Sequence, residues 1–456
     1  MNKDLDMARR LAEEVRSAGG NAYFVGGFVR DAVMGRDNKD IDIEVHGLTP
    51  PELEAILDRL GERTVMGASF GVYGLRHYNL DIAMPRSETK SGRGHKDFTI
   101  FVDPFLGTQK AAMRRDFTIN AMMQDVLTGE IIDHFSGLDD LKRGVIRHVS
   151  GSSFAEDPLR VLRAAQFAAR FGFSIAPDTM EICAGMDLTA LASERVMDEL
   201  CKALLKAPKP SVFFDVLRDM HQLGGWFPEV LALIGVEQEA KYHPEGDVYT
   251  HTMLVLNQAA ALREQAIYPL GLMFSALCHD FGKPQATRVI DGRIRAFDHE
   301  NLGVPLAQAF ISRLSSEVRL KKYVVSMVKL HMRPNSLFHM ESGRHAYMKL
   351  LDLSVEPADL LLLAKADHCG RTGHESDYGS IESSLQSMLH TYRELMSLPA
   401  VRGEDLIAAG MKPGKAMGEA LSFARRLQLR GVPKAQALSQ TLARMQSPDP
   451  RKTGGQ

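Results

Sequence analysis

The segment D-I-D-I-E-V at residues 40–45 places two carboxylates two residues apart, in a run that alternates between acidic and apolar side chains. Such alternation is typical of a β-strand, on which residues two apart share a face. Asp40 and Asp42 would therefore point the same way, and a divalent cation between them would relieve their repulsion. Taken alone, this pattern fits a solvated strand face better than a metal site.

Two neighbouring features favour the metal site. A short strand at residues 21–25 ends in Gly26-Gly27 and a helix follows, an arrangement in which backbone N–H groups can approach a phosphate. A third acidic residue, Asp81, lies in the strand-like run 71–84, where it could also be an ordinary edge-strand charge. Three acidic side chains on neighbouring strands suit a two-metal site for phosphoryl transfer, in which metals activate an attacking hydroxyl and stabilise a leaving pyrophosphate.

The run G-G-F-V-R-D at residues 26–31, followed by D-I-D at 40–42, resembles the signature of class II tRNA nucleotidyltransferases and bacterial poly(A) polymerases. Both groups belong to the DNA-polymerase-β-like nucleotidyltransferase superfamily. The resemblance implies that Asp40 and Asp42 hold two Mg²⁺ ions, and that Asp81 helps with the metal or the proton. It also implies that the 3′-hydroxyl of an RNA attacks the α-phosphate of CTP, then of a second CTP, then of ATP.

The segment R-R-D-F-T-I-N-A at residues 114–121 resembles a second motif of the same family. We expect a helix here, on which Asp116 and Asn120 are four residues apart and share a face. A solvated helix face is the alternative, although arginines near a helix N-terminus oppose the macrodipole and need a reason. The residues that the resemblance assigns to triphosphate and ribose are Gly26, Gly27, Arg30, Arg115, Asp116 and Asn120.

The segment E-D-P-L-R at residues 156–160, with Arg163 one turn further on, resembles the family's base-reading element. The resemblance implies that Asp157 and Arg160 hydrogen-bond the Watson–Crick edge of CTP or ATP, with Arg163 beside the nucleotide. A carboxylate can accept from the exocyclic amine that C and A share, and a guanidinium can donate to a ring nitrogen or carbonyl. The alternative is structural, because Asp157 before Pro158 also suits a helix N-cap.

The polar, glycine-containing run at residues 86–96 reads as a mobile basic loop, with a solvated connection as the alternative. In the family that the chain resembles, such a loop helps to switch from C to A addition, which implies complete CCA addition or A addition alone. The tract G-A-S-F-G-V at residues 67–72 matches the tRNA enzymes better than the basic stretch of the poly(A) polymerases. The cations expected to contact RNA here are Arg86, Lys90, Arg93 and Lys96.

Histidines and aspartates recur through the second half of the chain in the order H…HD…H…H…D. This ordered set resembles the HD phosphohydrolase superfamily, and it implies a site where imidazoles and carboxylates bind one or two divalent metals and a phosphate ester is hydrolysed. A helical scaffold with satisfied core histidines is the alternative. The metal stays open, and 2′,3′-cyclic phosphates and 2′-nucleotides are the substrates that the family suggests. The predicted ligands are His251, His279, Asp280, His299, His331 and Asp367, and Lys283 could assist a phosphate.

The end of the chain carries its one clear basic excess, with 11 Lys+Arg against 5 Asp+Glu in residues 391–456. The run 404–418 resembles the family's tail element, in which a glycine-rich turn precedes a helix. Lys412 and Lys415 could bind backbone phosphates there and give a salt-sensitive grip on a folded RNA. A solvated helical hairpin is the alternative.

The elements that must position these residues fall into two parts. Short β-like runs and helices alternate up to about residue 150, and helical spacing with almost no strand signals continues to about residue 442. We therefore predict an α+β head with a mixed sheet, followed by an all-α remainder. The predicted domains are a nucleotidyltransferase head at 1–150, a base-reading neck at 151–225, a helical body with the HD site at 226–390 and an RNA-binding tail at 391–456, its last ten residues disordered.

Composition narrows the class of protein. The chain has 456 residues, a formal net charge of −2, 45% hydrophobic residues and four cysteines without a C-x-x-C pair. This balance excludes wholesale disorder, requires any RNA-binding surface to be local, and disfavours a disulfide framework or a cysteine zinc finger. No apolar run reaches the roughly 18 residues of a membrane span, and the N-terminus has no signal-peptide core. We expect a cytoplasmic protein without a membrane partner.

Together the motifs predict a tRNA nucleotidyltransferase that adds CCA, with the tRNA 3′ end, CTP and ATP as partners and an additional HD phosphohydrolase site. One alternative is a narrower transferase, either A-adding or poly(A)-adding. Another is an HD phosphohydrolase whose head only presents RNA, and a third is a non-catalytic RNA-binding protein. The intact acids Asp40, Asp42 and Asp81 argue against the last two.

Overall fold

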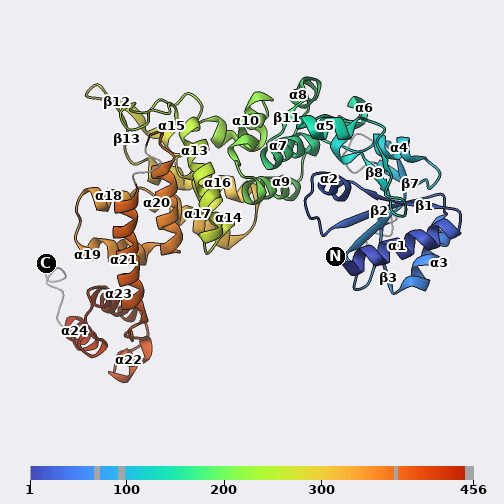
Figure 1. The fold of residues 1–456 in the computed structure, drawn as a ribbon. Coiled ribbons are helices and arrows are strands. Elements are labelled where there is room, and N and C mark those ends of the chain that lie inside the picture. Colours follow the sequence, from blue (N-terminus) through green and yellow to red (C-terminus); the bar gives the residue numbers. More distant parts are fainter. Residues whose placement is uncertain (1, 66–71, 91–97, 374–377, 447–456) are drawn as a thin grey trace. The chain divides into compact units, whose positions relative to one another are not determined.

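The computed structural model describes residues 2–65, 72–90, 98–373 and 378–446. The chain divides into two compact units, residues 1–207 with 212–226 and residues 208–211 with 227–456. The first unit contains a mixed sheet with helices, and the second is almost entirely helical (Figure 1). The predicted fold class is therefore confirmed, whereas the four-part division into domains stays a prediction.

A seven-stranded sheet forms the centre of the first unit, in the strand order β3-β4-β5-β2-β1-β8-β9. Strands β2 and β5 pair in parallel, and the other neighbours pair antiparallel. The parallel pair matters for the site because it brings the acidic residues of β2 and β5 side by side. The strands are β1 (Asn21–Val25), β2 (Ile41–His46), β3 (Arg63–Val65), β4 (Val72–Leu75), β5 (Leu80–Ala83), β8 (Met123–Asp125) and β9 (Ile131–Ile132).

Helix α1 (Asn2–Ser17) packs against β1, β2 and the helix α3 (Pro50–Leu60). The apolar residues of α1 recur at helical spacing, and its Leu11 and Val15 are fully buried. On β2 the alternation works as predicted, because Ile41 and Ile43 are buried while Asp42 between them is partly exposed. The hydrophobic face of the sheet thus fixes the direction in which Asp42 points.

The run 71–84, expected to be one strand, forms two strands instead. β4 and β5 are an antiparallel pair joined by a polar turn at residues 76–79. His77 has a φ of 73° in this turn, a left-handed conformation that usually signals glycine or asparagine. The sequence carries no such turn residue at position 77, so the break was missed.

The segment 114–121, expected to be a helix, is not one. Helix α4 (Thr108–Met113) ends before it, and only a short 3₁₀ turn, η1 (Thr118–Asn120), follows. Thr118 N donates to the carbonyl of Arg147, so the backbone is bonded to a distant segment rather than to a helical turn. The predicted loop at 86–96 also changes: β6 (Arg86–Lys90) pairs with β7 (Phe98–Val102), and residues 91–97 lie outside the described residues.

The rest of the first unit is a set of helices. Its longest members, α7 (Leu159–Phe171) and α9 (Ser193–Lys206), pack against each other. A short parallel pair, β10 (Val145–Ile146) with β11 (Ser174–Ile175), adds strand structure beyond residue 150, where helices alone were expected. The remaining helices are α2 (Gly27–Val33), α5 (Gly137–Arg143), α6 (Gly151–Phe154), α8 (Pro177–Ala184), α10 (Ser211–Asp219) and α11 (Leu223–Trp226).

Five helices enclose the core of the second unit: α13 (Val248–Leu262), α14 (Pro269–Cys278), α16 (His299–Leu314), α17 (Val318–Leu330) and α20 (Pro357–Cys369). Helix α14 is buried from Gly271 to Cys278, since α13, α17 and α20 all pack against it. A hairpin of β12 (Thr287–Ile290) and β13 (Arg293–Ala296) was not predicted. Its two strands have only four residues each and none of these residues is buried, so the sequence gives little strand signal here. The short elements are α12 (Pro228–Leu231), η2 (Arg263–Gln265) and α15 (Lys283–Ala286).

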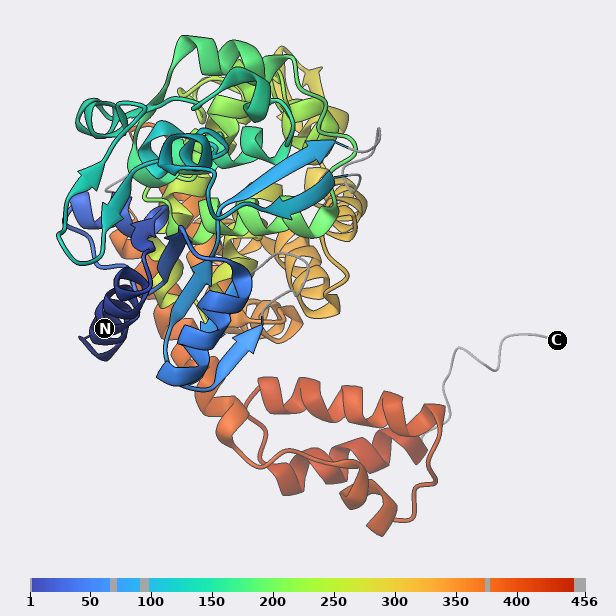
Figure 2. The same ribbon diagram turned by 90° about the vertical axis from the view of Figure 1, so that its right-hand side faces the viewer.

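The chain ends in a small group of helices, α22 (Gly403–Ala408), α23 (Lys415–Leu429) and α24 (Lys434–Gln446), drawn in red in Figure 2. Leu429 of α23 joins the hydrophobic cluster of α19 (Arg344–Leu353) and α21 (Gly379–Ser397). Arg425 pairs with Asp352 at 2.5 Å, which ties α23 to α19. α18 (Arg333–His339) packs against α19 and α21.

No helix in the described part of the chain combines the length and the apolar character needed to cross a membrane.

Candidate active sites

The acidic residues of the head meet at the parallel pair of strands. Asp42 on β2 lies opposite Asp81 on β5, and Asp40 directly precedes β2. The pKa of Asp42 is raised to about 6, because burial and the nearby charges of Asp81 and Asp40 outweigh the lowering effect of Arg115. Any nearby positive charge, including a divalent cation, would stabilise the ionised form of this carboxylate.

A cavity of about 630 Å³ opens beside these strands. Asp40 and Asp42 line it, whereas Asp81 is exposed and lies outside its lining. Eleven of the predicted residues thus share one cavity: Gly26, Gly27, Arg30, Asp40, Asp42, Arg115, Asp116, Asn120, Asp157, Arg160 and Arg163.

Gly26 allows two charged side chains to approach the turn between β1 and α2. Its φ is 65°, and a Cβ atom here would lie 3.0 Å from Arg115 Nη1 and 3.6 Å from Asp42 Oδ2. Arg115 is held from the other side by Glu44, at 3.3 Å. Glycine at this position therefore leaves room for the Arg115 side chain next to the acidic pair.

Glu44 was not predicted as a site residue, although it lies in the same D-I-D-I-E run. Its buried carboxylate lies 2.9 Å from His46 Nε2 and also contacts Arg115. Burial would raise its pKa, yet His46 and Arg115 lower it below the usual value. Glu44 is thus an ionised support for Arg115.

Arg30 and Asn120 connect the glycine turn to the segment 114–121. The Arg30 Nη1 atom donates to Asn120 Oδ1 at 2.7 Å, and its guanidinium lies 5.2 and 4.8 Å from the ring centres of Phe167 and Phe171. Asn120 Nδ2 in turn donates to Asp116 Oδ1 at 3.0 Å. Asp116 and Asn120 therefore meet as predicted, but through an irregular turn and not through a helix face.

Asp116 and Arg163 form a buried ion pair. Arg163 Nε and Nη2 lie 2.7 and 2.6 Å from Asp116 Oδ2. Burial would raise the pKa of Asp116, but the charge of Arg163 and the hydrogen bonds from Asn120 and Phe117 N lower it. Arg163 also lies 3.8 Å from Glu199 of α9, so this pair joins the turn to two helices.

Asp157 and Arg160 line the same cavity, and both already form hydrogen bonds or ion pairs with other groups of the protein. Asp157 Oδ1 accepts from the backbone N–H of Leu159, as in the capping alternative, and its Oδ2 pairs with Arg195 at 2.9 Å. Arg160 donates to the carbonyls of Ser153 and Arg114. The pairing of Asp157 with Arg195 was not predicted, because no sequence pattern brings α9 next to the start of α7.

The predicted RNA contacts are spread over the chain. Arg86 lines a second cavity, of about 260 Å³, together with Glu44, Arg114 and Arg115. Lys90 belongs to β6, and Arg93, Lys96 and residues 67–71 lie outside the described residues. Lys412 and Lys415 are exposed at the start of α23.

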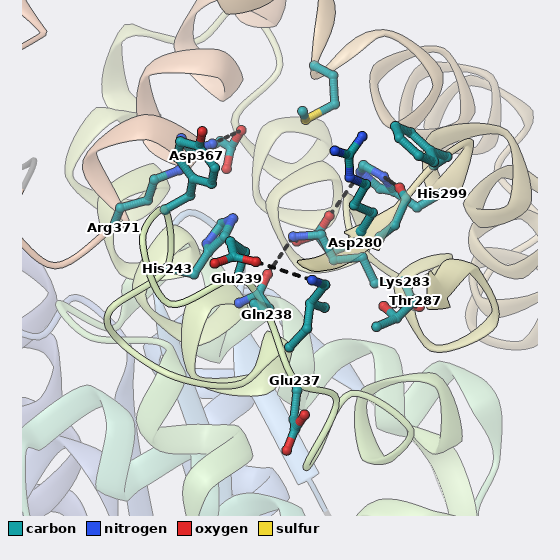
Figure 3. A pocket seen from close by; sticks show the side chains of 16 residues that line it. Glu237, Gln238, Glu239, His243, Asp280, Lys283, Thr287, His299, Asp367 and Arg371 are labelled. Carbon is teal, nitrogen blue, oxygen red and sulfur yellow. Dashed lines mark hydrogen bonds and ion pairs between the residues drawn. The ribbon is translucent and has the colours of Figure 1, made fainter. Parts of the chain in front are cut away.

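The predicted HD residues come together in the second unit, beside a cavity of about 330 Å³ (Figure 3). Asp280 is the centre: one of its oxygens is 3.3 Å from His299 Nε2, and the other is 3.1 Å from His279 Nε2. His331 Nε2 lies 3.3 Å from that of His299, and His251 Nε2 lies 3.1 Å from Asp367. All six predicted ligands are buried within one cluster: His251, His279, Asp280, His299, His331 and Asp367.

Three of these imidazoles are oriented by the same local contact. Nδ1 of His279, His299 and His331 lies 2.7–2.8 Å from the carbonyl of the residue three positions earlier. An imidazole that donates its Nδ1 proton to a carbonyl presents the Nε2 lone pair to a metal. Backbone carbonyls, two from helices and one from strand β13, thus select the tautomer that a metal site needs.

The donor set fits a divalent metal. Ligand atoms of Asp280, His299 and His331 lie within 4.8 Å of one another, as do those of His251, His279 and Asp367. His279 Nε2 is buried and has no hydrogen-bond partner among the described residues. Imidazole and carboxylate ligands suit transition metals, which would satisfy this atom. In the head, oxygen ligands suit Mg²⁺, although the described residues there do not bring three ligand atoms this close.

Two half-buried residues next to this cluster, His243 and Glu245, were missed in the sequence. Glu245 Oε1 lies 2.9 Å from both His243 Nδ1 and His251 Nδ1. Burial would raise the pKa of Glu245, but the hydrogen bonds from the two histidines lower it. The signal was present as H-P-E-G-D-V-Y-T-H at residues 243–251, where a second histidine and a glutamate precede His251.

Gly282 permits the close contact that places His299. A Cβ at this position would lie 2.0 Å from the His299 carbonyl and 2.6 Å from Gly303 N. Lys283, the next residue, pairs with Asp280 at 2.7 Å and donates to Gln238 at 2.6 Å. The turn after the His-Asp pair is therefore packed against the start of α16.

The chain is similar to known proteins in both sequence and structure. A poly A polymerase head domain matches residues 22–147, and a probable RNA and SrmB-binding site of polymerase A matches residues 172–234. The multifunctional CCA protein of Laribacter hongkongensis is 39% identical over 78% of this chain and 86% of its own length. That of Hahella chejuensis is 35% identical over 91% of this chain and 97% of its own length.

Solved structures share the fold. A Thermotoga maritima CCA-adding enzyme complexed with tRNA has a TM-score of 0.64 at 23% identity, over 98% of this chain and 96% of that one. A CCA-adding enzyme in complex with CTP has a TM-score of 0.66 at 22% identity over the same shares.

Proposed function

The chain belongs to the family of bacterial multifunctional CCA proteins, and from this membership we propose that it adds C, C and A to the 3′ end of tRNA, using CTP and ATP and no nucleic-acid template. The observation that carries this is one cavity that holds both the acidic pair Asp40 and Asp42 and the base-reading candidates Asp157 and Arg160. Transfer and base selection can thus act on one bound nucleotide.

In the reaction, the 3′-hydroxyl oxygen of the RNA forms a bond to the α-phosphorus, the bond from that phosphorus to the β-phosphate oxygen breaks, and pyrophosphate leaves. The hydroxyl proton passes to a base in the same step, either a water molecule or the carboxylate of Asp81. The family uses a divalent metal; we propose two Mg²⁺ ions held by Asp40 and Asp42, which would supply charge neutralisation at the α-phosphate and at the leaving group. Asp81, opposite Asp42, is the residue proposed to complete this acidic group.

The other residues of the cavity hold the nucleotide. Arg115, supported by Glu44, is placed to bind the triphosphate. Asp116 and Asn120 lie where a ribose hydroxyl can be bound, while Arg163 keeps Asp116 ionised. Asp157 can accept from the exocyclic amine of C or A once that amine replaces Arg195 at its Oδ2.

The four-part division stated above is our proposal for the domains, with a head, a base-reading neck, an HD body and an RNA-binding tail. We also propose that the protein acts in the cytoplasm, because its proposed substrate is tRNA.

One incubation tests the transferase. Purified protein, Mg²⁺ and a tRNA ending at the discriminator base receive CTP alone, ATP alone, or both. Two Cs followed by one A and then a stop is the expected result. Addition of A only to a preformed CC end, or a long A tail, would replace CCA addition by a narrower activity.

We further propose that the HD site hydrolyses phosphate esters with a divalent metal. The buried cluster of four histidines and two aspartates next to a cavity supports this. When bound, the metal would supply a Lewis acid and an activated water; Asp280 holds Lys283 at the mouth of the cavity, where its ammonium can face a phosphate. Assays of 2′,3′-cyclic AMP and 2′-AMP with Mg²⁺, Mn²⁺, Co²⁺ or Ni²⁺ test it, and no turnover with any of them would overturn it.

A further inference from the structure

The hairpin of β12 and β13 brings an exposed aromatic ring to the HD cavity. Phe297 directly follows β13; it lines the cavity and is 62% exposed. Its ring contributes nothing to the core of the unit, so core packing does not account for its place in the cavity lining. Its position in a cavity that also reaches the metal-binding cluster points to a ligand.

One face of this ring is already covered by a cation. The Arg295 guanidinium lies 5.5 Å from the centre of the Phe297 ring, in a cation–π contact. The contact holds the ring in place and leaves its other face for a second planar group. Nucleobases stack on such rings with little regard for their identity, because every base has a π-face.

The backbone couples this ring to the metal cluster. Phe297 lies between Ala296, whose carbonyl orients His299, and Asp298, whose φ of 64° is left-handed. Non-glycine residues rarely hold this conformation unless their surroundings impose it. The backbone therefore holds Phe297 close to the predicted metal ligand His299, which is two residues further along the chain.

A phosphate can be bound on the opposite side of the cavity. Arg371 lines it, and its only described ion pair is a loose one of 3.7 Å to Asp367. Arg371 Nε is buried and has no hydrogen-bond partner among the described residues. Such an atom costs free energy until an acceptor such as a phosphate oxygen reaches it. Figure 3 shows Arg371 beside Asp367, with Lys283 next to Asp280.

We propose that the HD cavity binds a single nucleotide, with its base stacked on Phe297 and its phosphate between the metal cluster and Arg371. The cavity volume of about 330 Å³ lies near the lower end of the range for small-molecule sites, about 300–1,000 Å³, so it suits one nucleotide rather than a longer strand. The same nucleotide chemistry can come from a free nucleotide or from the terminal residue of an RNA. This inference rests on the proposed hydrolysis and adds the feature that selects its substrates.

The test compares substrates with and without a base. Full-length protein is assayed with 2′,3′-cyclic AMP, with a short RNA ending in a 2′,3′-cyclic phosphate, and with glycerol 1,2-cyclic phosphate, which has the same ring but no base. Phe297→Ala should raise KM about tenfold for the substrates with a base, the size expected for one lost base stack, with little change in kcat. The glycerol substrate should be unaffected, and Phe297→Trp should restore wild-type values.

Val289→Ala is the matched control, because Val289 lies on the same hairpin, is 73% exposed and does not line the cavity. An effect on both the free nucleotide and the RNA end supports the proposal, and an effect on RNA alone supports it with RNA as the source. Unchanged KM values for both, or an equal loss with the glycerol substrate, overturn it.

A binding measurement separates this inference from the hydrolysis itself. The protein is stripped of metal with EDTA, and 2′-AMP is titrated into the wild type and into Phe297→Ala by calorimetry. About tenfold weaker binding by the variant supports the stacking site even if no metal yields turnover. Equal affinities overturn the stacking site, whatever the outcome of the hydrolysis assays.

Discussion

Asp42 and Asp81 lie directly opposite each other on the parallel strands β2 and β5. Two carboxylates on one face of a sheet repel each other, and this repulsion contributes to the raised pKa of Asp42. The two aspartates cannot turn to the other face of the sheet, because Ile41, Ile43 and Ile82 are buried there. The pair is therefore placed by the packing of the sheet and available to a cation.

Removing the negative charge of Asp42 should end nucleotide addition. Asp42→Asn keeps the size of the side chain but removes the charge that a metal needs, so we expect addition to tRNA to fall about 10³-fold or more. Hydrolysis at the HD site should stay within about twofold of the wild type. Incorporation of labelled CMP and AMP measures the first activity, and release of 2′-AMP or 3′-AMP from 2′,3′-cyclic AMP measures the second.

Asp37→Asn is the control for this variant, because Asp37 is an exposed acid near the cavity that does not line it. Nearly wild-type addition by Asp42→Asn would show that the head has been assigned wrongly. Asp40→Ala should behave like Asp42→Asn.

The buried pair of Asp116 and Arg163 should stabilise the first unit in a pH-dependent way. Asp116→Asn leaves Arg163 beside a neutral amide, and at pH 7 we expect a loss of about 3 kcal/mol in the free energy of unfolding. The folded-state pKa of Asp116 is lowered, so its stabilisation is complete above an unfolded pKa of about 3.9 and is lost as the pH falls towards the folded value.

The difference between wild type and Asp116→Asn should therefore narrow below about pH 4. Urea unfolding at pH 7, 5 and 3.5 measures it. A difference that stays constant over this range would contradict the role given to the ionised carboxylate.

Loss of an HD ligand should remove metal and hydrolysis together. We expect Asp280→Asn and His279→Ala to lose bound metal, measured by elemental analysis of the purified protein, and to lose hydrolysis of 2′,3′-cyclic AMP. CCA addition should be unchanged. His345→Ala is the control, since His345 is an exposed histidine of α19 outside the cluster. Full metal content in Asp280→Asn would exclude the cluster as the binding site.

Gly282→Ala should disturb the HD cluster without touching a ligand. The added Cβ would meet the His299 carbonyl at 2.0 Å, so α16 has to shift and carries His299 with it. We expect about 2–3 kcal/mol of destabilisation and at least tenfold weaker metal binding. Gly343→Ala serves as control, because a Cβ there has no neighbour within 4 Å and its φ is −67°. Equal metal affinity and equal stability in the two variants would disprove this packing argument.

The exposed lysines of the tail should set the salt dependence of tRNA binding. Neutralising Lys412 and Lys415 together should weaken binding and reduce the slope of log K against log salt by about 1–2, as each lost phosphate contact reduces it by about 0.7–0.9. Lys434→Gln is the comparison, because Asp405 already pairs with Lys434 at 2.8 Å. Filter binding at several salt concentrations gives the slopes; an unchanged slope in the double variant would move the RNA contact elsewhere.

Much of the fold follows from periodicity that the sequence displays openly. The strands at 21–25 and 41–46 were predicted closely, because the second alternates between acidic and apolar residues and the first ends at a pair of glycines. The break between β4 and β5 was missed because His77 takes a conformation that its residue type does not announce. The hairpin at 287–296 was missed because its strands are mostly exposed.

The candidate sites were predicted as sets of residues but not as contacts. Asp116 and Asn120 meet in the structure, yet through a 3₁₀ turn whose Thr118 N donates to the carbonyl of Arg147, far along the chain. The partner of Asp157, Arg195, lies on another helix, and only tertiary packing reveals it. Glu245 was visible next to His251 in the sequence, but its burial against two histidines was not.

The parallel pairing of β2 and β5 also limits how this chain can change its length in evolution. Side chains on a strand alternate between the two faces, so a slip of one residue in β5 would turn Asp81 inwards and expose Ile82. A single inserted residue in the 76–79 turn would force either that slip or a bulge. Insertions and deletions among descendants of this gene are thus confined to places where the chain can loop out without moving β5. The register of β5 against β2 is therefore conserved together with the acidic residues that it aligns.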